Sequence, residues 1–102
     1  MAKTLNPPKQ VTCGNSSQSL DLDNSTVKVI VRNRSGTQAA NINMGYAAPA
    51  DDTVPQQDGD DAITLFPGDE ITLDVPTGAD QHLNYINAAT GESPVLEVIQ
   101  IT

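Results

Sequence analysis

Apolar and polar residues alternate with a period of two along most of the chain, and no helical periodicity of about 3.6 residues persists. This alternation places apolar side chains on one face of a strand and polar side chains on the other. It predicts strands at 19–23, 27–33, 41–46, 63–65, 70–75, 82–87 and 95–101, and a short strand around Val11 and Cys13. In the last strand Leu96 and Val98 alternate, and then the apolar phase shifts to Ile99 and Ile101. The shift predicts a bulge, or burial on both faces.

A tight turn is predicted between the strands at 63–65 and 70–75. Pro67 fixes φ near the value that a type II turn needs, and Gly68 supplies the positive φ that follows it. The flanking strands alternate in the same sense, with Ile71, Leu73 and Val75 inward. The segment is therefore predicted to form a β-hairpin or a tight corner.

These elements give the predicted fold class and its boundaries. About eight short antiparallel strands with turn signals every ~8–12 residues are typical of an all-β protein, here a small β-sandwich of jelly-roll or Ig-like type. Residues 1–10, with Pro7-Pro8 and no alternation, are predicted to form an extended N-terminal arm before a sandwich domain at 11–102. Residues 47–61 form a long acidic loop whose prolines prevent ladder pairing. Loops of this length are usually functional or mobile.

The composition is that of one domain with an aliphatic core. The 102 residues include no Trp and one Phe, so the core must consist of Val, Ile and Leu. Cys13 is the single cysteine, which excludes an intrachain disulfide and a cysteine-based zinc site, and its simplest role is that of a small buried apolar residue. A domain of this size gains stability from assembly, so a homo-oligomer or a larger partner is expected.

Charge is divided unequally along the chain. Residues 1–34 carry five cations and two acids, a net +3, whereas residues 35–102 carry eleven acids and no cation, a net −11. Nucleic-acid binding needs clustered Lys and Arg, so the acidic body argues against it. Acidity keeps a β-protein soluble, and it also allows the basic strand of one subunit to meet the acidic surface of another.

Candidate chemistry is sparse. His82 is the single histidine and is most simply a surface or turn residue, and no nucleophile elbow, zinc-protease helix motif, P-loop or dinucleotide motif occurs. We therefore expect no enzyme activity, no catalytic residue and no cofactor. The acids at 58–61 have the oxygen ligands that Ca²⁺ prefers but not the EF-hand spacing, so a solvated loop is favoured over a metal site. The N-terminus lacks the apolar stretch of a signal peptide, and no run approaches the ~20 apolar residues of a membrane span. Cytoplasmic synthesis and no membrane partner are expected.

The chain resembles the small β-sandwich structural proteins of tailed bacteriophages, several of which are capsid decoration or cement proteins. The resemblance covers residues 18–102 and lies in a succession of motifs: VRNRSG and MGY at strand ends, an acidic loop, LFPGDEITLDV, LNYINAATGE and a terminal VLEVIQI. It implies a virion protein on the capsid exterior, made in the host cytoplasm, that stabilises the phage head by bridging subunits of the major capsid protein. It also implies a multimer, here a trimer or dimer, although the aromatic cluster of a trimer axis is missing.

Two groups of residues are expected to make the contacts. Such proteins commonly clamp neighbouring subunits with a terminal arm, which assigns capsid contact to Lys3, Leu5, Pro7, Pro8 and Lys9. Contact with a sister subunit is assigned to Lys28, Ile30, Arg32 and Arg34, with the two arginines near acids such as Asp69, Glu70 or Asp74.

Two other functions also fit the sequence. A phage-tail or cell-surface module for receptor binding or adhesion would be favoured by glycan binding at the 47–61 loop, although exposed aromatic residues are scarce. An acidic inhibitor that mimics nucleic acid would account for the net −11, but the acids are not regularly spaced along one face.

Overall fold

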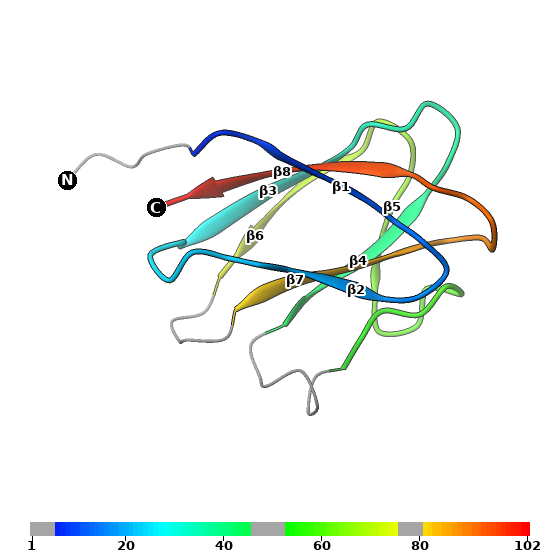
Figure 1. Cartoon of the computed structure of the whole chain (residues 1–102), viewed down its shortest axis with the longest axis horizontal. Coiled ribbons are helices and arrows are strands. Elements are labelled where there is room, and N and C mark those ends of the chain that lie inside the picture. Colours follow the sequence, from blue (N-terminus) through cyan, green and yellow to red (C-terminus); the bar gives the residue numbers. More distant parts are fainter. Residues whose placement is uncertain (1–5, 46–52, 76–80) are drawn as a thin grey trace.

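The structure is a computed structural model, and it describes residues 6–45, 53–75 and 81–102. In this part of the chain the regular elements are eight β-strands and no helix, as the alternation predicted (Figure 1). They are β1 (Lys9–Thr12), β2 (Gln18–Asp21), β3 (Lys28–Asn33), β4 (Ala40–Gly45), β5 (Ile63–Leu65), β6 (Glu70–Asp74), β7 (His82–Asn87) and β8 (Val95–Ile101).

The strands form two four-stranded antiparallel sheets. Sheet A has the order β1-β8-β3-β6 and sheet B the order β2-β7-β4-β5. The pairings β1–β8, β2–β7, β3–β6 and β4–β5 are nested, so the two halves of the chain run side by side as one long hairpin. The additional pairings β3–β8 and β4–β7 join these ladders into the two sheets. The small all-β sandwich expected from the sequence is thus present.

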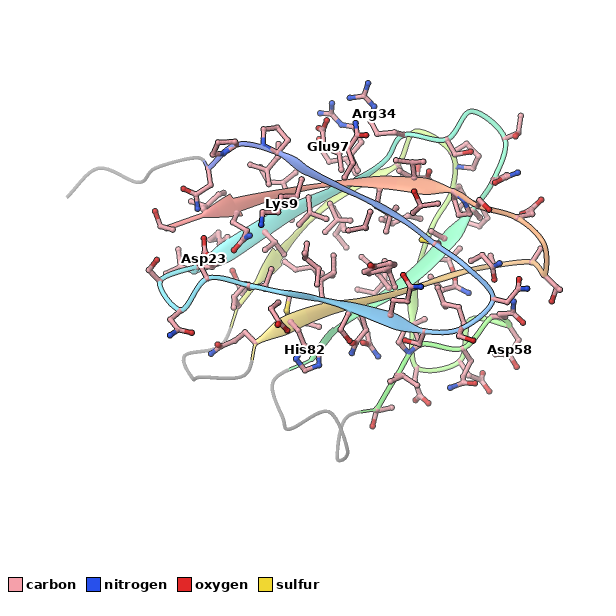
Figure 2. All side chains as sticks on the ribbon, in the orientation of Figure 1. Lys9, Asp23, Arg34, Asp58, His82 and Glu97 are labelled. Carbon is pink, nitrogen blue, oxygen red and sulfur yellow. The ribbon has the colours of Figure 1, made fainter. Side chains whose placement is uncertain are left out.

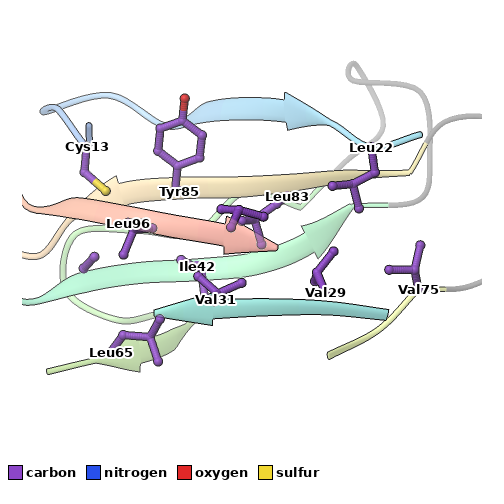
Figure 3. Packing of buried hydrophobic residues seen from close by; sticks show 12 residues of the cluster. Cys13, Leu22, Val29, Val31, Ile42, Leu65, Val75, Leu83, Tyr85 and Leu96 are labelled. Atoms are coloured by element: carbon purple, nitrogen blue, oxygen red, sulfur yellow. The ribbon is translucent and has the colours of Figure 1, made fainter. Parts of the chain in front are cut away.

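The core lies between the sheets and is mainly aliphatic, as predicted (Figure 3). Sheet A contributes Val29, Val31, Leu96 and Val98, and sheet B contributes Ala40, Ile42, Leu65, Leu83 and Tyr85. Burial of one such aliphatic side chain stabilises a fold by about 1.5–3 kcal/mol relative to leaving it exposed. Cys13 belongs to the same cluster, and its burial raises the pKa of the thiol to about 12. The expectation of a buried apolar cysteine is confirmed.

The segment around Pro67-Gly68 is a corner between the sheets and not a hairpin. Asp69 N–H donates to Phe66 O at 2.9 Å and Gly68 has φ +83°, which is the predicted type II turn. However, β5 belongs to sheet B and β6 to sheet A, where β6 pairs with β3. The end of β3 holds the corner, because Asn33 N–H donates to Asp69 O and Gly68 N–H donates to Asn33 O. The hairpin alternative is therefore wrong.

The phase shift in β8 is not a bulge. The register with β3 is continuous from Lys28 opposite Ile101 to Asn33 opposite Leu96. Ile99 and Ile101 are half-buried on the outer face of sheet A, whereas Gln100 between them points inward and is buried. The Oε1 atom of Gln100 accepts hydrogen bonds from Asp23 N–H and Thr26 Oγ1, both at 2.8 Å. The apolar pattern shifts because Gln100 occupies an inward position, where it accepts the hydrogen bonds of the β2–β3 turn.

The arm and strand boundaries differ from the prediction at the N-terminus. β1 begins at Lys9, and Asn6 N–H already donates to Gln100 O at 3.0 Å, so residues 6–10 follow the edge of β8. Lys3 and Leu5 lie outside the described residues. Val27, predicted to point inward, precedes β3 and is 46% exposed.

The described part of the acidic loop, residues 53–61, lies against the outer face of sheet B. Asn41 on β4 donates from Nδ2 to the carbonyl oxygens of Gln56 and Gln57, at 2.9 and 3.0 Å. Asn43 donates from Nδ2 to Thr53 O and Asp61 O, at 2.7 and 3.0 Å. Because outward-facing amides of β4 bind both ends of the segment 53–61, this part of the loop is fixed to the sheet.

Candidate functional site

The residues assigned to subunit contact lie together on the outer face of sheet A. Lys28, Ile30 and Arg32 alternate with the buried Val29 and Val31, and they therefore point away from the core. Their register partners on this face are Asp74, Thr72 and Glu70 of β6 and Ile101, Ile99 and Glu97 of β8. The outer face of sheet A therefore combines cations, acids and aliphatic side chains.

Ion pairs within the chain connect the charges of this face. Lys28 Nζ lies 3.2 Å from Asp74 Oδ1, and Arg32 Nη2 lies 2.5 Å from Glu70 Oε1. The hydrogen bond and the negative charge of Glu70 raise the pKa of Arg32. Both acids had been expected near Arg32 and Arg34, across a contact with a sister subunit. The structure places them on the adjacent strand of the same chain.

Arg34 joins the same group through β8. Its Nη1 atom lies 3.1 Å from Glu97 Oε2, and Arg32 Nη1 lies 3.9 Å from Glu97 Oε1. Figure 2 shows the side chains of Arg34 and Glu97 close together. Asp69, the third acid expected near the arginines, instead accepts a hydrogen bond from Phe66 N–H at 3.0 Å inside the corner. Ion pairs between exposed side chains, here Lys28–Asp74 and Arg32–Glu70, are each worth about 0–1 kcal/mol. They neutralise the face locally without holding it rigidly.

An aliphatic strip runs between the charged pairs. Ile30 stands directly opposite Ile99, and Ile101 follows two positions along β8. All three side chains are half-buried. The sequence already indicated that Ile30 is an apolar residue on a cationic face, and the strip extends that feature to the neighbouring strand.

Of the residues assigned to the arm, the structure describes Pro7, Pro8 and Lys9. Pro7 and Pro8 are exposed before β1, and Lys9 lies within β1, opposite Val98. The side chain of Lys9 points to the same face of sheet A as its partner Val98, which is the inner face. Arg34 and Glu97 lie on the other side of β8 (Figure 2). Lys9 is the one cation in the described part of the chain that forms no ion pair there. Lys9 therefore does not share the outer face of sheet A with Lys28, Arg32 and Arg34.

The titratable residues considered for chemistry are dispersed. His82, expected at the surface, is instead buried at the start of β7. Within residues 6–45, 53–75 and 81–102, no three His, Cys, Asp or Glu side chains are grouped to hold a metal ion. The same residues contain no helix long and apolar enough to span a membrane.

The loop fixed to sheet B forms a hollow that sequence reasoning missed. It is an open cavity of about 350 Å³, which we call the amide hollow, and it is lined by Asn15, Gln56, Gln57, Asp58 and Ile86. The lining comes from the β1–β2 connection, the acidic loop and β7. The amides of the loop were visible in the sequence, but their contact with Asn15 and Ile86 depends on long-range pairing. No local pattern reports that pairing.

The comparisons with known proteins give no relative. No protein family, no curated protein and no solved structure matches the chain.

Proposed function

We propose that this chain is a virion structural protein that decorates the exterior of a phage head and stabilises it by bridging subunits of the major capsid protein. The observation that carries the proposal is the strand order. Two four-stranded sheets with nested pairs β1–β8, β2–β7, β3–β6 and β4–β5 have the order of a jelly roll, an architecture of viral capsid proteins and lectins. This order favours the jelly roll over an Ig-like sandwich, whose sheets contain ABED and CFG strands.

A fold alone does not define a function, so the proposal also rests on the outer face of sheet A. Lys28, Arg32 and Arg34 alternate with acids across this face, and the strip of Ile30, Ile99 and Ile101 lies between them. Such a surface fits a coat subunit or a second copy of the chain in a dimer or trimer. Its exposed ion pairs are weak, so they can exchange for pairs across a contact at little cost.

The mechanism is geometric. A rigid sandwich fixed to two coat subunits holds them at one separation, and many copies on a head add their weak contacts through avidity. The N-terminal residues before β1 would reach a neighbouring coat subunit from the edge of sheet A. No catalytic step and no cofactor takes part, and synthesis in the host cytoplasm followed by addition to the head is the corresponding route.

The nucleic-acid mimic is less well supported. Glu70, Asp74 and Glu97 are paired with cations on their own face. A mimic needs unneutralised acids that repeat like phosphates, and this face does not present them.

The testing experiment is co-sedimentation of the purified protein with phage heads that have been stripped of accessory proteins. We expect saturable binding at a fixed ratio to the coat subunit. Thr72→Arg places a long cation at the centre of the outer face of sheet A, opposite Ile30, and should reduce binding at least tenfold. Thr37→Arg makes the same change at an exposed position of the β3–β4 loop and is the matched control.

The arm is tested separately by deletion of residues 1–5. The deletion should stop there, because Asn6 and β1 are hydrogen-bonded to β8. We expect lost retention on heads with an unchanged unfolding temperature. Binding of the full-length protein to no head, or equal binding by all these variants, would contradict the proposal.

A further inference from the structure

We propose that the amide hollow binds a neutral polyhydroxylated ligand, namely one saccharide unit of a glycan. The proposal is independent of capsid binding, because the hollow lies against sheet B and the proposed coat contact lies on sheet A. Its volume of about 350 Å³ is at the lower end of the ~300–1,000 Å³ of small-molecule sites.

The free hydrogen-bonding groups of the hollow match hydroxyl groups. Asn15 Oδ1 is occupied, because it accepts from Asn87 Nδ2 at 2.9 Å and from Gly91 N–H at 2.8 Å, which leaves the Asn15 NH₂ group as a donor. Asp58 Oδ1 accepts from Asp60 N–H at 3.0 Å, which leaves Oδ2 as an acceptor.

Gln56 adds a second acceptor. Its Nε2 donates to Val54 O at 3.3 Å, and its Oε1 accepts no hydrogen bond from the described residues. One donor and two acceptors therefore surround the same space. A sugar hydroxyl donates and accepts at once, so neighbouring hydroxyls can satisfy both kinds of group.

The lining disfavours other ligand classes. It contains one carboxylate and no cation, so a phosphate or another anion would meet repulsion from Asp58. A wholly apolar ligand would leave the amides without partners. Ile86 is a buried residue of β7 and the one apolar side chain of the lining, and its small exposed part is a contact for the C–H face of a sugar ring.

The loop side of the hollow is ordered before any ligand arrives. Asn41 binds the carbonyls of Gln56 and Gln57, and Thr64 Oγ1 donates to Asn41 Oδ1 at 2.7 Å, which fixes the orientation of that amide. Gln57 Nε2 also donates to Asn87 Oδ1 at 2.6 Å. A preformed wall lowers the entropic cost of binding.

The expected affinity is weak. None of the five lining residues is aromatic, so the stacking surface that strengthens sugar binding is missing. A dissociation constant on the order of 1 mM is expected for one unit, with useful strength only when many copies engage one glycan.

The test is an NMR titration of the ¹⁵N-labelled full-length protein with glucose, galactose, mannose and N-acetylglucosamine, each in turn. We expect saturable shifts of the Asn15 side-chain amide and the Gln56 and Gln57 amides with at least one sugar. Gln56→Leu removes the Oε1 acceptor but keeps the backbone carbonyl that Asn41 binds. It should weaken the binding of that sugar at least tenfold. Gln10→Leu is the matched control, because Gln10 is an exposed amide on β1.

Three results would overturn the proposal. They are the absence of saturable shifts with all four sugars, equal shifts in Gln56→Leu, and equal shifts with glycerol at the same hydroxyl concentration. Head binding by the same preparations is measured in parallel, so that failure of the saccharide site and failure of the capsid proposal are distinguished.

Discussion

At the scale of single residues, the buried side chain of Gln100 provides the hydrogen-bond acceptor for a neighbouring turn. It occupies an inward position of β8, where the alternation leads one to expect an aliphatic residue. Its Oε1 atom instead accepts from Asp23 N–H and Thr26 Oγ1, so the β2–β3 turn is satisfied inside the sandwich. A buried donor that loses its acceptor costs about 1–3 kcal/mol.

Gln100→Met is therefore expected to lower the free energy of unfolding by about 2 kcal/mol or more, because methionine keeps the length of the side chain and lacks the acceptor. Urea denaturation followed by circular dichroism measures the change. Gln10→Met, on the exposed face of β1, is the control and should remain within about 0.5 kcal/mol of the parent. Equal stability of the two variants would show that the buried hydrogen bonds contribute nothing.

At the scale of elements, the corner at 66–69 transfers the chain from sheet B to sheet A. Gly68 adopts φ +83°, and a residue with a Cβ atom is strained there by about 1–2 kcal/mol. Gly68→Ala should lower stability by that amount and loosen the junction of β5 and β6. Hydrogen exchange at Asn33, whose N–H donates to Asp69 O, reports the junction directly.

Gly36→Ala is the matched control for this corner. A Cβ atom at Gly36 meets nothing within 4 Å, and the residue does not have the left-handed φ of Gly68. The substitution should be neutral or slightly stabilising, because alanine reduces the freedom of the unfolded chain. If both alanine variants were equally stable, the turn geometry would not limit the corner.

The elements also show why sequence predicts strands better than their partners. Alternation is a local property, so the eight strands and the type II turn were predictable from the residues themselves. The pairing of β6 with β3 was not, because a hairpin and a corner have the same alternation on both sides of Pro67-Gly68. The hydrogen bonds from Asn33 that decide between them join residues more than 30 positions apart.

The candidate site likewise has features that follow from local alternation and features that follow only from long-range pairing. The outward positions of Lys28, Ile30 and Arg32 followed from alternation along one strand, whereas the acids that pair with them followed from strand order. The amide hollow joins three segments that are distant in sequence, so no local pattern predicts it. Composition likewise indicated an acidic loop but not that Asn41 and Asn43 fix it to sheet B.

At the scale of the whole molecule, the nested strand order pairs the first strand with the last. β1 pairs only with β8 and is the edge of sheet A, and Val11 packs against the core. The stability of the sandwich should therefore change abruptly with the position at which the N-terminus is cut.

Deletion of residues 1–5 is expected to leave the free energy of unfolding within about 0.5 kcal/mol of the parent, since it keeps Asn6 and the whole of β1 with their hydrogen bonds to β8. Deletion of residues 1–12 removes β1, uncovers the edge of β8 and exposes part of the Leu96 and Val98 packing. A domain with a total stability of about 5–15 kcal/mol cannot lose a sheet edge without losing much of it, and the open edge of β8 favours self-association. Thermal unfolding and size-exclusion chromatography of both truncations distinguish these effects. A cooperative, monomeric unfolding transition retained by the longer truncation would mean that β8 closes sheet A without β1, and that residues 1–12 as a whole are free to act as the arm.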